Sequence, residues 1–144
     1  MCGLLGERVF KSKKLTDKNQ FLNILNLSYQ RGPDSQDYFT DGKNIQLGFN
    51  RLAVLDLTEN GNQPIDSPSN RYTMVFNGEI YNHLELRKSI PQDKYIFKGH
   101  GDTETLIACF DHHGIIATTK MLDGMFAIGI FDHAEKKLHL IRDF

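Results

Sequence analysis

Short segments with the composition of β-strands, separated by turn-forming residues, recur along most of the sequence and restrict what it can fold into. A polar turn at Asp41-Gly42-Lys43-Asn44 separates two of these segments, and another at 134–137 predicts a hairpin. We expect strands at 4–10, 37–40, 45–49, 52–57, 72–76, 95–97, 126–131 and 138–141. This pattern favours sheets whose strands are mostly antiparallel.

Apolar residues also recur at helical spacing between some of these strands. After Thr16 or Asp17, either of which can cap a helix, the helical pattern continues until Gly32-Pro33 stops it. Helices are also expected at 83–89, 103–113 and 115–122. Helices interspersed among antiparallel strands indicate an α+β fold.

The bulk composition excludes some classes of partner. With 144 residues the chain is large enough for one domain with a single core. Its 17 basic residues nearly balance its 18 acidic residues, for a net charge of −1. A chain without excess positive charge is not expected to bind nucleic acid or an anionic membrane surface. The composition therefore favours a site for a small molecule.

No segment directs the chain to a membrane or out of the cell. No apolar run approaches the ~20 residues that span a bilayer. The first ten residues carry Glu7 and Arg8 where a signal peptide needs an apolar stretch. The two cysteines are Cys2 and Cys109, and Cys109 lies in an apolar run, where it is most simply a small core residue. We expect a cytoplasmic protein with two free thiols.

Cys2 becomes a candidate nucleophile with its own base if Met1 is removed, because one residue then carries both a thiol and a free α-amino group. The thiolate is the nucleophilic form, and a free thiol, with a pKa of about 8.5, needs a base at neutral pH. An α-amino group, with a pKa of about 7.7–8.0, can accept the proton directly or through one water. Most proteins that begin with Met-Cys make no use of the cysteine, so Cys2 alone does not identify a catalytic site.

Three polar clusters that contain glycine lie at expected strand ends or loops, where backbone amides can approach a ligand. They are Arg31-Gly32-Pro33-Asp34, Asn77-Gly78-Glu79-Ile80-Tyr81-Asn82 and Gly99-His100-Gly101-Asp102-Thr103-Glu104. Arg51, just after the expected strand 45–49, adds a cation. Arg-Gly and Asn-Gly are common turn pairs, so each cluster by itself is equally well explained as a turn.

Taken together with Cys2, these clusters resemble one family. The motifs that carry the resemblance are Met1-Cys2-Gly3 with Gly6, Arg31-Gly32-Pro33-Asp34-Ser35, Arg51-Leu52-Ala53-Val54-Leu55-Asp56, Gln63-Pro64, Asn77-Gly78-Glu79-Ile80-Tyr81-Asn82, Gly101-Asp102-Thr103-Glu104, Leu122-Asp123-Gly124-Met125-Phe126-Ala127 and Arg142-Asp143. In this order the chain resembles the glutamine-hydrolysing domain of class II amidotransferases, the N-terminal-nucleophile type. It is most similar to the N-terminal half of asparagine synthetases.

The resemblance implies a fold and an activity for residues 1–144. The fold would be the four-layer αββα sandwich of N-terminal-nucleophile hydrolases, as the N-terminal part of a type 2 glutamine amidotransferase domain. Because the last expected strand runs almost to Phe144, we expect the domain to continue beyond it. The activity would be hydrolysis of L-glutamine to L-glutamate and ammonia. The resemblance also implies a C-terminal synthetase domain of the same parent chain, which uses ATP and Mg²⁺. It implies no cofactor or metal in the present domain, and it is compatible with a homodimer.

The resemblance assigns the chemical steps to three residues. Cys2 would attack the side-chain carboxamide of glutamine, and its own amine would take the thiol proton and later protonate the departing ammonia. The side-chain amide of Asn77 and the backbone N–H of Gly78 would stabilise the tetrahedral oxygen. Losing one donor of this kind typically costs about 10²–10³ in rate.

The resemblance assigns the substrate's charged groups to further residues. Arg51 would hold the α-carboxylate, a planar group that fits a guanidinium fork. Asp102, with Glu79, would hold the α-ammonium, since a buried zwitterion needs both of its charges paired. Further residues of the implied site are Leu52, Val54 and Leu55, which line the pocket, and Arg31 and Gly32, which belong to a loop that closes over it.

Two departures from the family and three other interpretations accompany this hypothesis. The family usually has His at the position of Asn50 and often has Ser at that of Gly101. The run Asp111-His112-His113 is similar to a phosphoesterase signature, but companion metal carboxylates are missing, so we interpret it as a solvated helix end. The same glutaminase could serve another acceptor, such as a sugar or another carboxylate. A non-catalytic glutamine-binding module is the alternative from a different class.

Overall fold

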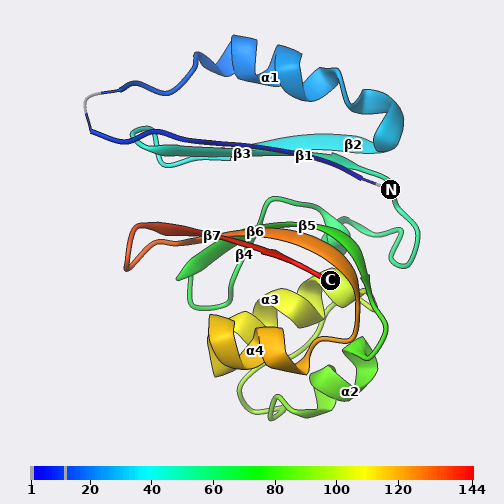
Figure 1. Cartoon of the computed structure of the whole chain (residues 1–144). Coiled ribbons are helices and arrows are strands. Elements are labelled where there is room, and N and C mark those ends of the chain that lie inside the picture. Colours follow the sequence, from blue (N-terminus) through cyan, green and yellow to red (C-terminus); the bar gives the residue numbers. More distant parts are fainter. Residues whose placement is uncertain (1, 12) are drawn as a thin grey trace.

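The computed structural model describes residues 2–11 and 13–144, which form four layers in the order helix, sheet, sheet, helices (Figure 1). The two sheets pack face to face, and the helices cover their outer faces. Neighbouring strands in both sheets are antiparallel. The α+β class and the αββα arrangement of N-terminal-nucleophile hydrolases are therefore confirmed.

The first sheet has three strands in the order β1-β3-β2, and helix α1 covers its outer face (Figure 1). Its elements are β1 Gly3–Arg8, α1 Lys18–Asn26, the 3-10 turn η1 Tyr29–Arg31, β2 Ser35–Thr40 and β3 Ile45–Arg51. The side chain of Asp17 caps α1 by accepting a hydrogen bond from the backbone N–H of Asn19. The helix buries Phe21 and Leu25, and it approaches the sheet at Gly48, where a Cβ would lie 2.7 Å from Leu25 Cδ2.

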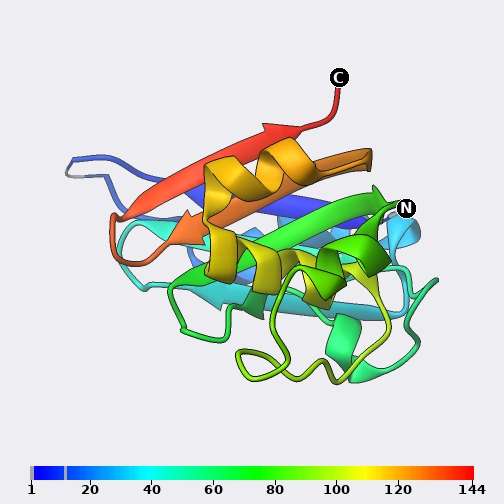
Figure 2. The ribbon, with the colours of Figure 1, turned by 90° about the horizontal axis from the view of Figure 1, so that it is seen from below.

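The second sheet has four strands in the order β4-β5-β6-β7, and three helices lie over its outer face (Figure 2). Its elements are β4 Ile65–Asp66, β5 Tyr72–Ile80, α2 His83–Lys88, α3 Asp102–His113, α4 Ile115–Met121, β6 Gly124–Asp132 and β7 Lys137–Arg142; the 3-10 turn η2 Glu59–Gly61 precedes them. Helix α3 buries Leu106, Ile107 and Phe110 in one cluster with Met74 and other side chains of the sheet. This cluster anchors the residues just before α3.

The inner faces of the two sheets meet in a second apolar cluster. Ile45, Leu47 and Phe49 project from β3 and contact Val75 of β5 and Phe131 of β6. These three positions are two residues apart, so alternate side chains of β3 face the inner core and the α1 side. Packing on both faces fixes the end of β3 relative to β5.

A groove of about 500 Å³ opens between the sheets on the side of β1 and β7. Its wall is mostly apolar, with residues such as Leu4, Val75 and Leu140. Of the polar residues singled out from the sequence, Arg142 lines it, and the residues with an assigned role in the glutamine site do not. In the described residues, no helix combines the length and the apolar character that a bilayer crossing requires.

The expected strand at 52–57 is wrong. This segment is an irregular loop after β3, and Val54 and Leu57 are exposed by 73% and 79%. Alternating apolar residues make a strand when a sheet edge is available to pair with them. Here the backbone N–H groups of Leu52 and Ala53 donate instead to Cys2 Sγ and to Asp34 Oδ2. The side chains of Cys2 and Asp34 therefore accept hydrogen bonds that a neighbouring strand would otherwise accept.

The expected strand at 95–97 is also wrong, for a similar reason. Tyr95 and Phe97 stack edge to face and pack against the core beneath α2 and α3. The buried carboxylate of Glu104 accepts hydrogen bonds from Tyr95 Oη and from the backbone N–H of Lys98, both at 2.8 Å. A single side chain thus organises this segment without a partner strand.

Other boundaries differ from the expectation by several residues. Strand β5 continues beyond Phe76 to Ile80, because β6 pairs with it as far as Gly124. The polar cluster at Asn77 therefore begins inside a strand. The two-residue strand β4 was not expected at all, and α1 ends at Asn26, well before Gly32.

Candidate active site

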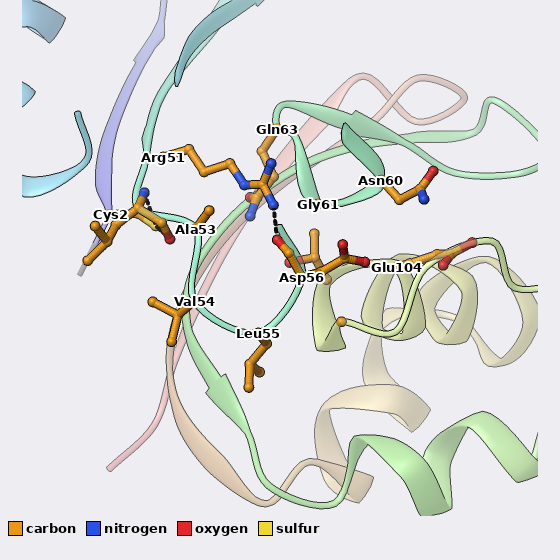
Figure 3. Close-up of a pocket in the computed structure, with 13 residues that line it drawn as sticks. Cys2, Arg51, Ala53, Val54, Leu55, Asp56, Asn60, Gly61, Gln63 and Glu104 are labelled. Carbon is orange, nitrogen blue, oxygen red and sulfur yellow. Dashed lines mark hydrogen bonds between the residues drawn. The ribbon is translucent and has the colours of Figure 1, made fainter. Parts of the chain in front are cut away.

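Cys2 lies between the two sheets at the start of β1, where groups far apart in the sequence surround it (Figure 3). Its backbone nitrogen donates a hydrogen bond to Asn77 Oδ1 on β5 at 2.9 Å. Its Sγ accepts from the backbone N–H of Leu52 at 3.3 Å and lies 3.7 Å from Leu52 O. Both the thiol and the nitrogen that becomes the α-amine after removal of Met1 are thus held in fixed directions.

Asn77 faces this cysteine from the second sheet, and Gly78 follows it on β5. The contact with Cys2 occupies Asn77 Oδ1, and no described residue accepts a hydrogen bond from Asn77 Nδ2. Gly78 has a φ of 155°, and a Cβ there would lie 2.1 Å from the carbonyl oxygen of Met125 on β6. Glycine is therefore required at this position of β5, where it pairs with β6.

The segment from Arg31 to Asp34 brackets the same site. Arg31 Nε donates to the carbonyl oxygen of Cys2 at 3.1 Å. Asp34 donates its backbone N–H to Arg51 O at 3.0 Å, and its Oδ2 accepts from the N–H of Ala53 at 2.8 Å. This segment thus contacts both Cys2 and the loop after β3.

Gly32 allows this segment to approach β3, since a Cβ at position 32 would lie 2.2 Å from Asn50 O. We expect Gly32→Ala to destabilise the protein by ~1–3 kcal/mol, the usual cost of overpacking, as measured by denaturant unfolding. Gly6→Ala is the control, because its Cβ would meet Leu47 Cδ2 at a milder 3.3 Å. Equal stability of the two variants would show that the segment can move away from β3 without cost.

Arg51 is buried, and its guanidinium points toward Asp56 (Figure 3). Nη1 donates to Thr58 O at 2.8 Å and to Asn62 Oδ1 at 2.7 Å, while Nη2 donates to Asp56 O. A guanidinium has five N–H donors. Within the described part of the chain, Nε and the second hydrogen of Nη2 keep no partner. Arg51 therefore organises the loop and still retains two donors.

A cavity of about 70 Å³ adjoins Cys2 and Arg51 (Figure 3). Loop residues 51–56 line it together with Asn60, Gly61, Gln63, Gly101, Thr103 and Glu104. It is far smaller than the ~300–1,000 Å³ of pockets that enclose drug-sized ligands. It suits one end of a small polar molecule.

Asp102 and Glu79 lie near the end of β5 and outside the wall of this cavity. Asp102 is buried at the start of α3, where its Oδ2 accepts from the backbone N–H of Ile80 at 3.0 Å. Burial raises the pKa of the Asp102 carboxyl above its ordinary value. Glu79 is exposed. The structure therefore brings together Cys2, Asn77, Arg31 and Arg51, while Asp102 and Glu79 form no hydrogen bond with these four residues in the described part of the chain.

Comparison with known proteins identifies the family to which this arrangement belongs. The sequence matches a family model described as a glutamine amidotransferase domain over residues 1–144. It is 39% identical to the glutamine-hydrolysing asparagine synthetase 1 of Bacillus subtilis over 99% of this chain. It is 34% identical to the probable glutamine-hydrolysing asparagine synthetase of Schizosaccharomyces pombe, also over 99% of this chain. The chain belongs to the glutamine amidotransferase domain family.

The chain spans only 22% and 25% of the lengths of these two relatives. Among solved structures, it is similar to the glutamine phosphoribosylpyrophosphate amidotransferase of B. subtilis in complex with ADP and GMP. The TM-score is 0.52 and the identity 21%, and the match covers 96% of this chain and 30% of that one. At this identity the likeness shows a shared fold.

Three residues of this glutamine amidotransferase domain hold the site together but received no role from the sequence. Asp56 Oδ2 accepts from the N–H of His100 at 3.0 Å, Glu104 Oε2 accepts from that of Gly99 at 2.7 Å, and Arg87 Nη1 donates to Gly99 O at 2.8 Å. The order Asp56-Leu57-Thr58 is typical of an Asx turn, which could have revealed Asp56. The contacts of the other two span loops and carry no local signal.

The two positions that depart from the family pattern, Asn50 and Gly101, are in close contact with other residues of the domain. Asn50 is buried, donates to Leu25 O at 2.8 Å and accepts from Gln36 Nε2 at 2.7 Å. A Cβ at Gly101 would lie 3.2 Å from that of Asp56, which leaves little room for serine. In the described residues, no group of three His, Cys, Asp or Glu side chains converges as a metal site would require.

Proposed function

We propose that this domain hydrolyses L-glutamine to L-glutamate and ammonia through a γ-glutamyl thioester on Cys2. The observation that carries the proposal is the position of Cys2, with its nitrogen 2.9 Å from Asn77 Oδ1 and its thiol against the backbone of Leu52. Membership of the glutamine amidotransferase family and the names of the relatives support the choice of glutamine.

The reaction begins once Met1 has been removed. The neutral α-amine of Cys2 takes the thiol proton, and Sγ attacks the carboxamide carbon of glutamine. The carbonyl oxygen becomes negative, and Asn77 Nδ2 with the backbone N–H of Gly78 stabilises it. The tetrahedral intermediate then expels ammonia, which receives its proton from the ammonium of Cys2. In the second half of the reaction the Cys2 amine takes a proton from water, which attacks the thioester carbon. The intermediate expels the Cys2 thiolate, which recovers the proton from the ammonium, and L-glutamate leaves.

The charged groups of the substrate fit the polar residues around Cys2. The donors on Nε and Nη2 of Arg51 that have no partner in the described part of the chain match the two oxygens of one α-carboxylate. Asp102 and Glu79, near the end of β5, supply negative charge for the α-ammonium. Leu52, Val54 and Leu55 line the cavity beside Cys2 and Arg51.

Replacing Arg51 with lysine tests the carboxylate site. Lysine keeps the charge but loses the planar fork, so we expect KM for glutamine to rise by about tenfold or more while kcat changes less. Steady-state glutamate release measures both constants. Arg31→Lys is the comparison, because Arg31 is exposed and contacts the carbonyl of Cys2. An unchanged KM in Arg51→Lys would place the carboxylate elsewhere.

The ammonia is proposed to serve a synthetase domain of a longer parent protein. The two relatives are named as glutamine-hydrolysing asparagine synthetases, and each is much longer than this chain. ATP and Mg²⁺ would act in that second domain, in the cytoplasm, and this domain would need no cofactor. A relative from Gibberella zeae, 35% identical over 83% of this chain, is named amidase chry2 rather than asparagine synthetase. An acceptor other than aspartate is therefore the alternative. Product analysis with aspartate and with other carboxylates distinguishes these acceptors.

Intact mass spectrometry with a glutamine-like electrophile tests the glutaminase proposal directly. The reagent 6-diazo-5-oxo-L-norleucine alkylates a nucleophile that sits in a glutamine site. We expect a chain that lacks Met1 and carries one adduct, mapped to Cys2 and prevented by excess glutamine. A processed chain without adduct, or one with its adduct on Cys109, would contradict the proposal. Glutamine binding by calorimetry without glutamate release would favour the non-catalytic module instead.

A further inference from the structure

The groups that would bind glutamine lie on two segments that belong to different layers of the fold. The loop 52–62 follows β3 of the first sheet, and residues 99–101 precede α3, which covers the second sheet (Figures 1 and 3). Arg51 lies at the start of the first segment and Asp102 directly after the second. The distance between the carboxylate site and the ammonium site therefore depends on how these segments are joined.

The carboxylate of Asp56 joins them. Its Oδ1 accepts hydrogen bonds from the N–H and the hydroxyl of Thr58, at 2.8 and 2.6 Å. Its Oδ2 accepts from the backbone N–H of His100 at 3.0 Å. The carbonyl oxygen of Asp56 accepts from Arg51 Nη2. One residue thus contacts the guanidinium, its own loop and the opposite segment.

The segment 99–101 is rigidly held on its other side. Arg87 Nη1 and Nη2 donate to the carbonyl oxygens of Gly99 and Gly101, at 2.8 and 2.9 Å. Glu104 accepts the N–H of Gly99 at 2.7 Å. At Gly99 a Cβ would lie 2.4 Å from Asp56 Oδ2, so glycine permits the close approach. Asp56 therefore bonds to a segment, 99–101, that Arg87 and Glu104 also hold through hydrogen bonds.

The loop 52–62, by contrast, has little apolar packing of its own. Val54, Leu55 and Leu57 are all exposed, so their side chains contribute little burial that could fix the loop. Polar contacts must hold it in place. The donors around Asp56 also hold the pKa of its carboxyl at about 2, which keeps the carboxylate charged near neutral pH.

We propose that Asp56 is a positioning residue that holds Arg51 and the loop 52–62 at a fixed separation from Asp102, and so sets the spacing of the glutamine site. This role rests on the proposed glutaminase function. Asp56 does not touch the reacting atoms. It acts on substrate affinity through Arg51 and through the segment that leads to Asp102.

The test is Asp56→Asn in the full chain. Asparagine offers one acceptor oxygen and one NH₂ group, so it cannot accept from both Thr58 and His100. Loss of one charge-assisted hydrogen bond predicts a rise in KM for glutamine of about tenfold, with kcat changed by less than about threefold. Amide hydrogen exchange at His100 or at Thr58 should accelerate, which reports the broken contact without reference to catalysis.

Asp132→Asn is the matched control. Asp132 also accepts from two backbone N–H groups, those of Ala134 and Glu135, and forms an ion pair with Arg71, but it lies at the end of β6 and does not line the cavity. We expect this control to lower the melting temperature and to leave KM unchanged. A rise in KM in Asp56→Asn but not in Asp132→Asn distinguishes a positioning role from a general effect on stability.

Two results would overturn the role of Asp56. One is an Asp56→Asn variant with the KM and the amide exchange of the unmodified protein. The other is a variant that behaves like Asp132→Asn, with a lower melting temperature and no change in KM. Failure of the glutaminase proposal looks different, because the unmodified protein would then release no glutamate at all. That result would remove both proposals, whereas the first two would remove only this one.

Discussion

Cys2→Ala is expected to reduce glutamine hydrolysis by at least ~10³-fold, because it removes the atom that forms the thioester. Glutamine should still bind, since Arg51 and Asp102 are unchanged and the Cys2 nitrogen keeps its partner Asn77. Glutamate release and calorimetry measure the two quantities separately.

Cys109→Ala provides the control for this prediction. Cys109 is fully buried in α3, and burial raises the pKa of its thiol to about 11, so it should carry no reactivity. This variant should lose some stability and keep its turnover. If Cys2→Ala hydrolyses glutamine at the rate of the unmodified protein, the nucleophile lies elsewhere.

Asn77→Asp should lower kcat by about 10²–10³, with little change in KM. Aspartate can still accept the hydrogen bond from the Cys2 nitrogen, but it replaces the Nδ2 donor with an oxygen. The substitution therefore removes the stabilisation of the tetrahedral oxygen while keeping the contact with the nucleophile. Single-turnover measurement of thioester formation places the loss at the first chemical step.

Asn82→Asp is the control for Asn77, because Asn82 belongs to the same motif. Its Nδ2 donates to Met121 O at 2.8 Å and its Oδ1 accepts from the N–H of Asp123 at 3.1 Å. We expect it to destabilise the junction of α2 with α4 and to change kcat by less than about threefold. Should Asn77→Asp retain full kcat, another donor must stabilise the oxygen.

The proposed nucleophile and its proposed oxyanion donors belong to different layers of the fold, so the proposed activity depends on the packing between the two sheets. Cys2 precedes β1 and Asn77 lies on β5, and they are 75 positions apart in the sequence. The inner cluster of Phe49, Val75 and Phe131 fixes the distance between the sheets. Because close-packed interiors resist deformation, substitutions in this cluster should affect turnover as well as stability.

Much of the fold could be predicted from the sequence where the signals are local. The apolar spacing that predicts a helix at 103–113 matches α3, Asp102–His113, and Gly114 ends it with a φ of 83°. The hairpin around 134–137 also forms, as β6 and β7. Such elements are predictable because the side chains that stabilise them lie within one or two turns of each other.

The segments 52–57 and 95–97 show where this reasoning fails. Both are short apolar runs of the kind that form strands, and neither pairs with a sheet edge. Whether an edge is available depends on the positions of distant elements, so local sequence cannot indicate it. The carboxylates of Asp34 and Glu104 accept hydrogen bonds from the backbone of these loops, and these contacts also depend on the tertiary structure.

The sequence by itself determined which chemical groups are present: a cysteine that can become N-terminal, an asparagine-glycine pair and an arginine. Together with its motifs, it also determined the family. Only the tertiary structure decided that the Cys2 nitrogen meets Asn77 Oδ1, that two donors of Arg51 have no partner among the described residues, and that Asp56 joins two segments. The physical reason is that these contacts form between layers, where distance depends on the packing of whole sheets and helices and leaves no periodic signal in the chain.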